Sequence, residues 1–370
     1  MKESLTKRNV GADVIRSLAF FSVVCVHFFL NNGFYQNTVA GERMFVMTLM
    51  RSFFIICVPL FMMLSGFLMR QKALLGGYYK KLSKTLLTYV LAGVFCILYA
   101  VLVQEKTYTL GAVVRSFFAF EAAPYAWYIE MYVGLFLLVP FLNVLWNNLP
   151  SRRAKQTLLL VLVILTALPA LFNAHDPFHF SWLSKPSEMG TPFRLLPDWW
   201  TGIYPLTYYF IGCYLSEYGF RMNRLLNAAL ILVTVLVSGA YAFWRSIGTT
   251  FVWGKWCDYL SIFNVVLTTL VFVFFLNLDY SRLPRAGLWL LRKISALSLG
   301  AYLLSWIFDQ AFYPILVARV PQMTDRLEYF FLIVPAVAVS SLLLSQVLSW
   351  LQRGLEWLLA LPMRLKSKEG

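Results

Sequence analysis

The sequence predicts an all-α, polytopic membrane protein with about ten transmembrane helices and both termini in the cytoplasm. Of its 370 residues, 60% are hydrophobic, 17% are aromatic and only 13% are charged. Soluble domains carry about 25% charged residues, so this chain would expose far too much apolar surface in water. The composition therefore excludes an ordinary soluble enzyme, a disordered protein and a small disulfide-stapled domain.

Ten segments are long and apolar enough to cross a bilayer, which takes about 20 residues of helix. The fifth is short, and the sixth contains Pro205 and Gly212. Because the longest loop is 174–200, we expect residues 1–370 to form a single membrane domain with no appended soluble domain. The polar N-terminal flank favours a retained first helix over a signal peptide. In chain order the predicted spans are roughly 12–31, 45–69, 85–104, 127–146, 157–173, 201–220, 225–243, 258–277, 294–315 and 328–351.

The net charge of +15 fits this topology. With the N-terminus inside, 21 of the 32 Lys and Arg residues fall on cytoplasmic segments, and all six of those segments are basic. The positive-inside rule therefore supports ten crossings, with both ends cytoplasmic. The excess of cations records the topology and requires no nucleic-acid partner. The expected location is the bacterial cytoplasmic membrane.

The first predicted helix carries the densest set of polar residues at membrane depth, where charged groups are costly and are functional candidates. Arg16 and His27 are 11 residues apart, so they share one helix face about 16 Å apart along the axis. Asp13, three residues before Arg16, lies on the same stripe. An imidazole suits proton transfer near neutral pH. The alternative is a juxtamembrane ion pair with a structural histidine between helices.

Two further segments could serve a substrate on the cytoplasmic side. In the second helix, Ser65 can form a hydrogen bond across helices, and Gly66 allows a close backbone approach, although such a pair is usually packing. Lys80, Lys81 and Lys84 open the third helix and could clamp phosphates. Their simpler interpretation is a positive-inside anchor.

Acidic and aromatic residues gather at the predicted outer side. Trp127 and Tyr128 suit an aromatic belt and could also stack on sugar rings. The belt does not explain Glu130 in the same helix or Asp309 in the ninth, and either acid could orient or receive a proton from His27. The outer segment 175–179 has two histidines around an aspartate, but Pro177 disfavours a regular helix there, so we expect no metal site.

These residues together resemble the acyltransferase 3 family of integral membrane acyltransferases. The resemblance rests on Asp13, Arg16 and His27 in the first helix, the segment VPLFMMLSGFLM at 58–69, the basic stretch that opens the third helix, AWYIEMYVGLFLLVPFLN at 126–143 and the ten-span layout. It implies transfer of an acetyl or other short acyl group from cytoplasmic acyl-CoA to a hydroxyl of a cell-surface sugar, polysaccharide or peptidoglycan precursor. Two positions depart from the pattern: Lys81 and Lys84 stand where arginines are expected, and the run 301–305 lacks a histidine.

The resemblance also implies roles for the candidate residues. Arg16, with Asp13 and the lysines 80–84, would meet the phosphates of acyl-CoA, and Ser65 would help to hold the donor. His27 would act as general base, directly or through an acyl-His27 intermediate, with Glu130 or Asp309 as its partner. Trp127 and Tyr128 would contact the acceptor glycan. Acceptor and acyl chain are left open by the sequence. The rival interpretations are a polysaccharide or lipid-linked sugar exporter and a non-enzymatic membrane sensor, although the inverted repeats typical of transporters are not evident.

Overall fold

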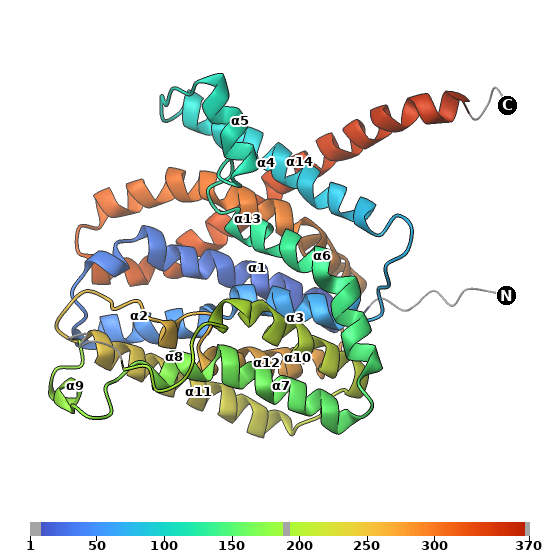
Figure 1. Ribbon diagram of the computed structural model, residues 1–370. Coiled ribbons are helices and arrows are strands. Elements are labelled where there is room, and N and C mark those ends of the chain that lie inside the picture. Colours follow the sequence, from blue (N-terminus) through green and yellow to red (C-terminus); the bar gives the residue numbers. More distant parts are fainter. Residues whose placement is uncertain (1–8, 188–192, 367–370) are drawn as a thin grey trace.

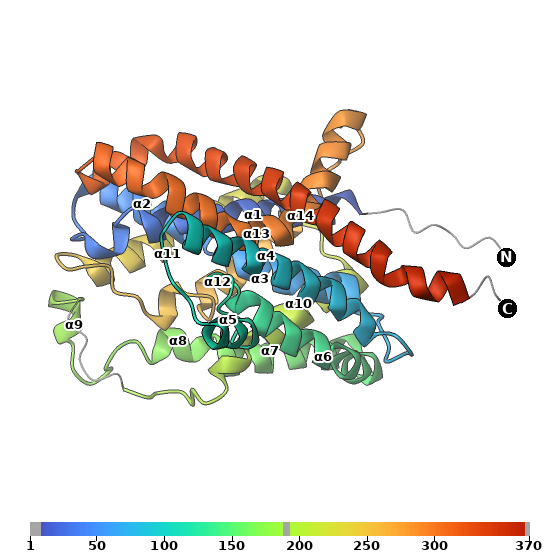
Figure 2. The same cartoon turned by 90° about the horizontal axis from the view of Figure 1, so that it is seen from above.

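A computed structural model describes residues 9–187 and 193–366, which fold into a bundle of helices (Figures 1 and 2). Within these residues the only β pairing is two isolated bridges, Thr38 with Thr250 and Val39 with Ile247. The all-α prediction is therefore confirmed for the described part of the chain. The elements are α1 (Val10–Asn31), η1 (Phe34–Gln36), α2 (Gly41–Phe54), α3 (Cys57–Met69), η2 (Tyr79–Lys81), α4 (Leu82–Leu102), α5 (Leu110–Phe118), α6 (Trp127–Asn148), α7 (Arg152–Thr166), α8 (Leu168–Phe172), α9 (Ser181–Ser184), η3 (Thr201–Ile203), α10 (Tyr204–Tyr218), α11 (Arg224–Ser246), η4 (Lys255–Cys257), α12 (Ile262–Leu276), α13 (Arg285–Arg319), η5 (Met323–Tyr329) and α14 (Phe330–Lys366).

Nine helical segments of the described chain are long and apolar enough to cross a membrane. They correspond to every predicted span except 201–220, which forms η3 and the 15-residue helix α10. A helix of 15 residues is about 22 Å long, short for a hydrocarbon core of about 30 Å. The protein is nevertheless a multi-pass membrane protein, and α10 packs against α3 and α7 within the bundle (Figure 1).

Contacts at both ends of α10 fix its place in the bundle. At its last turn, Glu217 forms ion pairs with Lys155, at the start of α7, and with Arg70, just after α3. At its first residue, the ring of Tyr204 stacks on Tyr259, which precedes α12. The first and last described helices also begin and end at the same end of the bundle (Figures 1 and 2). An even number of crossings accounts for this arrangement.

The predicted second span is broken into α2 and α3 at residues 55–56. Pro59 explains the position of the break. Proline lacks the N–H group that would bond to the carbonyl four residues earlier, and its ring clashes with that carbonyl, which here belongs to Ile55. The ladder resumes at once, since the backbone N–H of Leu60 donates to the carbonyl of Ile56 at 2.9 Å.

Helices α3 and α10 cross with their backbones in contact. A Cβ atom on Gly66 would lie 1.8 Å from the carbonyl oxygen of Tyr209, and one on Gly212 would lie 1.9 Å from that of Met63. Two glycines that face each other let the backbones touch, which is how membrane helices without a hydrophobic driving force gain packing energy. The close approach expected at Gly66 is therefore present, with α10 as the partner.

Helix α1 lies at the centre of the bundle and packs against α2, α3, α12, α13 and α14. Its neighbour α13 runs in the same direction, from the end where α1 begins (Figure 1). Of the cations that support the topology, Lys2, Lys7, Arg8 and Lys368 lie outside the described residues.

Candidate active site

Two levels of polar contact join α1 to α13, one near the beginning of α1 and one near its end. Asp13 meets Ser295 at the first level, and His27 meets Asp309 at the second. In each helix the two positions are 14 residues apart, which corresponds to about 21 Å of helix. Because α1 and α13 run parallel and in register, their equal spacing allows both pairs to form contacts.

The first level is a hydrogen-bonded chain through Ser295. The Ser295 hydroxyl donates to Oδ1 of Asp13 at 2.7 Å and accepts from Nη1 of Arg16 at 3.1 Å. Asp13 is buried, whereas Arg16 is partly exposed and borders a cavity. The side chain of Asn9 caps α1 by accepting from the backbone N–H of Ala12 at 3.1 Å. The cap fixes the start of α1, the helix that carries Arg16, and so helps to hold the Arg16 guanidinium at the cavity.

A cavity of about 360 Å³ extends from Arg16 between α1, α3, α6 and α13. Its wall carries Arg16 and seven side chains with hydroxyl groups, and the remaining residues are apolar. Such a channel, with one cation at its border, fits a slender chain with an anionic end. The residues that line it are Arg16, Val23, Val58, Phe61, Leu64, Ser65, Leu68, Met69, Thr85, Tyr128, Ile129, Tyr132, Ser295, Ala296, Ser298, Leu299 and Tyr302.

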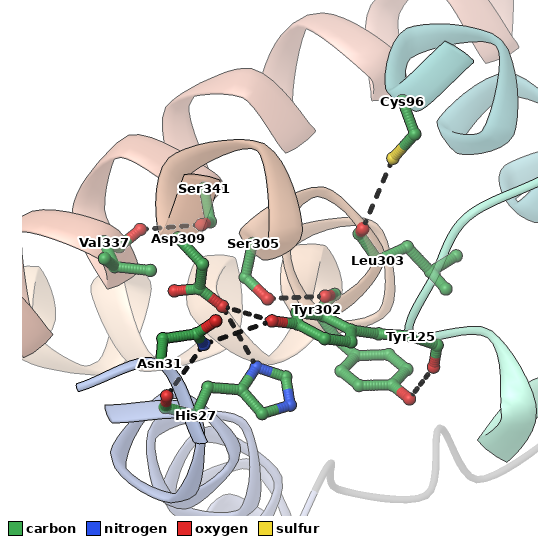
Figure 3. Close-up of polar contacts among 10 residues, drawn as sticks. All are labelled: His27, Asn31, Cys96, Tyr125, Tyr302, Leu303, Ser305, Asp309, Val337 and Ser341. Atoms are coloured by element: carbon green, nitrogen blue, oxygen red, sulfur yellow. Dashed lines mark hydrogen bonds and ion pairs between the residues drawn. The ribbon is translucent and has the colours of Figure 1, made fainter. Parts of the chain in front are cut away.

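The second level is the buried pair His27 and Asp309 (Figure 3). Nδ1 of His27 lies 3.4 Å from Oδ2 of Asp309, close enough for an ion pair but without the geometry of a hydrogen bond. Nδ1 and the other carboxylate oxygen, Oδ1, are both buried and lack a hydrogen-bond partner among the described residues. Nε2 faces away from the carboxylate (Figure 3). A carboxylate beside one ring nitrogen leaves the other to exchange protons with a substrate.

Tyr125, just before α6, joins the same group. Its hydroxyl donates to Oδ2 of Asp309 at 2.8 Å and accepts from Nδ2 of Asn31 at 3.3 Å. Its ring lies against the imidazole of His27, with 3.9 Å between the ring centroids. The backbone carbonyl of Tyr125 accepts a hydrogen bond from the hydroxyl of Tyr302. Asp309 is thus the predicted acid that lies beside His27.

The other predicted residues are more scattered. Glu130 is exposed and does not line the cavity. Ser65 lines it, but its hydroxyl donates back to the carbonyl of Phe61 at 2.9 Å. Tyr128 is buried and borders the cavity. Trp127 is 41% exposed and stacks on Tyr259 with 5.6 Å between ring centroids.

The lysine stretch lies outside the cavity. Lys80, Lys81 and Lys84 are all exposed, on η2 and the first turn of α4. None of them lines the cavity, although Thr85, the residue after Lys84, does. Arg16 is therefore the basic side chain on the cavity wall.

The two histidines of segment 175–179 face different partners. His175 stacks on Trp182, contacts the Tyr241 hydroxyl through Nε2 at 2.6 Å and accepts from Arg245 at Nδ1. Burial and the Arg245 cation lower the pKa of His175 to about 4, so the ring is neutral at pH 7. His179 pairs with Asp176 at 2.7 Å. Within the described residues no three His, Cys, Asp or Glu side chains gather as metal ligands.

Sequence reasoning missed Ser295 and Tyr302, which form a simple pattern on α13 together with the predicted Asp309. Ser295, Tyr302 and Asp309 are seven residues apart, so they lie on nearly the same face of the helix. Polar residues that recur every seven positions within an apolar span were a readable signal for the helix face that meets α1. Asn31, four residues after His27, was a second. Tyr125 had no such signal, because it belongs to an irregular segment.

The model of the acyltransferase 3 family, described as an acyltransferase domain, matches residues 9–345. The chain belongs to the acyltransferase 3 family. The matched segment runs from the residue before α1 into α14, so it contains both polar levels and the cavity. No curated protein and no solved structure matches the chain. Family membership makes the protein a membrane acyltransferase.

Proposed function

We propose that the protein transfers an acetyl or other short acyl group from cytoplasmic acyl-CoA to a hydroxyl of a cell-surface sugar, polysaccharide or peptidoglycan precursor, in the bacterial cytoplasmic membrane. The observation that carries this proposal is the buried pair of His27 and Asp309, one helical turn beyond Val23 on the cavity wall. A proton acceptor at membrane depth has a high desolvation cost and needs a functional reason.

The cavity supports the donor side of the proposal. Acyl-CoA is a polyanion with a thin pantetheine arm that ends in the thioester. Arg16 would pair with its phosphates, while Ser295 and Asp13 hold the guanidinium in place. The apolar walls suit the arm, and Arg16 and His27 are about 16 Å apart along α1. The exposed lysines 80, 81 and 84 would add only long-range attraction.

His27 supports the chemistry. Nε2 would take the proton of the acceptor hydroxyl as its oxygen attacks the thioester carbonyl carbon. The new C–O bond forms, the C–S bond breaks, and the imidazolium returns the proton to the leaving thiolate. Asp309 would stabilise the imidazolium at Nδ1 and hold the ring in orientation. Trp127, 41% exposed at the first residue of α6, would offer a stacking face to a sugar ring.

The test is His27→Ala in purified protein with acetyl-CoA and candidate glycan acceptors. General base catalysis contributes about 10²–10⁴-fold, so the acylated product should fall by at least a hundredfold. His179→Ala is the matched control, because that ring is exposed. Wild-type product from His27→Ala would remove His27 from the mechanism. Transport of a lipid-linked sugar into liposomes without acyl-CoA would support an exporter instead.

Labelled acetyl-CoA without acceptor separates the two chemical routes. Label retained on the wild-type protein, and lost in His27→Ala, indicates an acyl-His27 intermediate. No retained label, together with full transfer when acceptor is added, indicates direct attack. Mass spectrometry of surface glycans from a deletion strain would then name the acyl group and its carrier.

A further inference from the structure

The cavity stops short of the imidazole that the reaction needs. Val23 and Tyr302 line it, but His27, one turn beyond Val23, does not. Tyr125 lies between the cavity and His27. Its ring covers the imidazole at 3.9 Å, and its backbone carbonyl is bonded to the Tyr302 hydroxyl on the cavity side. The contacts therefore lead from Tyr302 on the cavity wall through Tyr125 to His27, three residues that Figure 3 draws together.

Three contacts hold Tyr125 in this place. Its hydroxyl bonds to Asp309 and Asn31, and its carbonyl bonds to Tyr302. The side chain is anchored at its tip and the backbone at its base, and these contacts hold the partition closed when no donor is bound. Tyr125 belongs to the irregular segment between α5 and α6, so its backbone is not tied into a helical ladder.

The Tyr125 hydroxyl also competes with His27 for Asp309. It donates a hydrogen bond to Oδ2 at 2.8 Å, while Nδ1 of His27 approaches the same oxygen only to 3.4 Å, without hydrogen-bond geometry. The Nδ1 and Oδ1 atoms are left buried and unpartnered. Buried polar atoms without partners are costly. The free-energy cost of displacing Tyr125 would therefore be offset by a proper hydrogen bond between His27 and Asp309.

We propose that Tyr125 is a positioning residue that separates the donor cavity from His27 and occupies the Asp309 carboxylate until a donor displaces it. The proposal rests on the proposed function of His27 and the cavity. Closed, the partition keeps water and His27 away from the thioester. Open, it admits the thioester to Nε2 and couples Asp309 to Nδ1 in one movement.

The first readout is the accessibility of His27, which requires no catalysis. Diethyl pyrocarbonate modifies histidine rings, and the fraction modified at His27 is measured by mass spectrometry relative to His179, whose side chain is 79% exposed. We expect Tyr125→Ala to speed modification of His27 at least tenfold, with His179 unchanged. Tyr125→Phe keeps the ring and should stay closer to the wild type. Equal rates in Tyr125→Ala and wild type would overturn the partition.

The second readout is cleavage of acetyl-CoA without acceptor. Water then adds to the thioester carbonyl, the C–S bond breaks, and acetic acid and the CoA thiol leave. We expect Tyr125→Ala to raise this hydrolysis at least tenfold while acceptor-dependent transfer falls. A merely structural role would lower both rates together, and that result would count against the proposal.

A second variant and a separate check of the proposed function keep the test decisive. Size-exclusion chromatography shows whether Tyr125→Ala folds. If it does not, Tyr302→Phe is used instead, because it removes only the bond to the Tyr125 carbonyl and should still raise the modification of His27. No increase in Tyr302→Phe would count against the partition. The proposed function fails separately: full transfer by His27→Ala removes the base, whatever the modification rates show.

Discussion

Polar side chains at membrane depth divide into those that the sequence could connect and those that it could not. Asp13, Arg16 and His27 lie on one helix, so a periodicity of 3.6 residues places them on one stripe. The pairing of His27 with Asp309 joins residues 282 positions apart, and no local rule predicts it. That pairing depends on the parallel contact of α1 with α13, which is a property of the whole bundle.

Arg16 and Lys84 allow the donor site to be located by substitution. Arg16→Ala should raise the KM for acetyl-CoA by about 10–150-fold, because a hydrogen bond to a charged group contributes about 1.5–3 kcal/mol. Lys84→Ala should change it less than about fivefold, because exposed ion pairs are worth about 0–1 kcal/mol. Initial rates at saturating acceptor measure both. A larger effect from Lys84→Ala would move the phosphates to the lysine stretch.

At the scale of helices, proline and glycine set the geometry that apolar runs leave undetermined. Hydrophobicity alone predicts one span at 45–69, whereas Pro59 breaks it into α2 and α3. The amphipathic helix α5 was missed, because nine residues are too few to register as a span. Gly66 was identified as a point of close approach, but its partner Gly212 could not be assigned, because any of the predicted helices could have faced it.

The crossing of α3 and α10 predicts a large effect from one methyl group. Gly66→Ala would put Cβ against the backbone carbonyl of Tyr209, which cannot move without separating the helices. Overpacking typically costs about 1–3 kcal/mol, so the midpoint of thermal unfolding in detergent should fall by several degrees. Gly134→Ala in α6 is the control, because nothing lies within 4 Å of its added Cβ. It should be neutral or slightly stabilising. Equal midpoints for the two variants would contradict the close crossing.

For the whole molecule, the charge pattern and the packing agree on how segments are grouped. Arg70 and Lys155 come from two segments predicted to be cytoplasmic, and both meet Glu217 at the end of α10. Aromatic rings gather around the start of α10, with Trp127 and Tyr204 both against Tyr259. Which end faces the cytoplasm is a prediction of the positive-inside rule. The step on which ten crossings depend is α10, which is shorter than the nine other spans.

Single cysteines on either side of α10 test that step. In a ten-span protein Arg194→Cys should react from outside with a membrane-impermeant maleimide on intact spheroplasts, whereas Arg221→Cys should react only after permeabilisation. Both positions are exposed. The unmodified chain is the control, because four of its cysteines are buried and Cys257 is only partly accessible. If both variants react from the same side, α10 does not cross the membrane, and the predicted cytoplasmic location of the end of α14 is wrong. If Arg194→Cys reacts only after permeabilisation and Arg221→Cys reacts from outside, the bundle is inverted, and Arg16 would face away from the cytoplasmic donor.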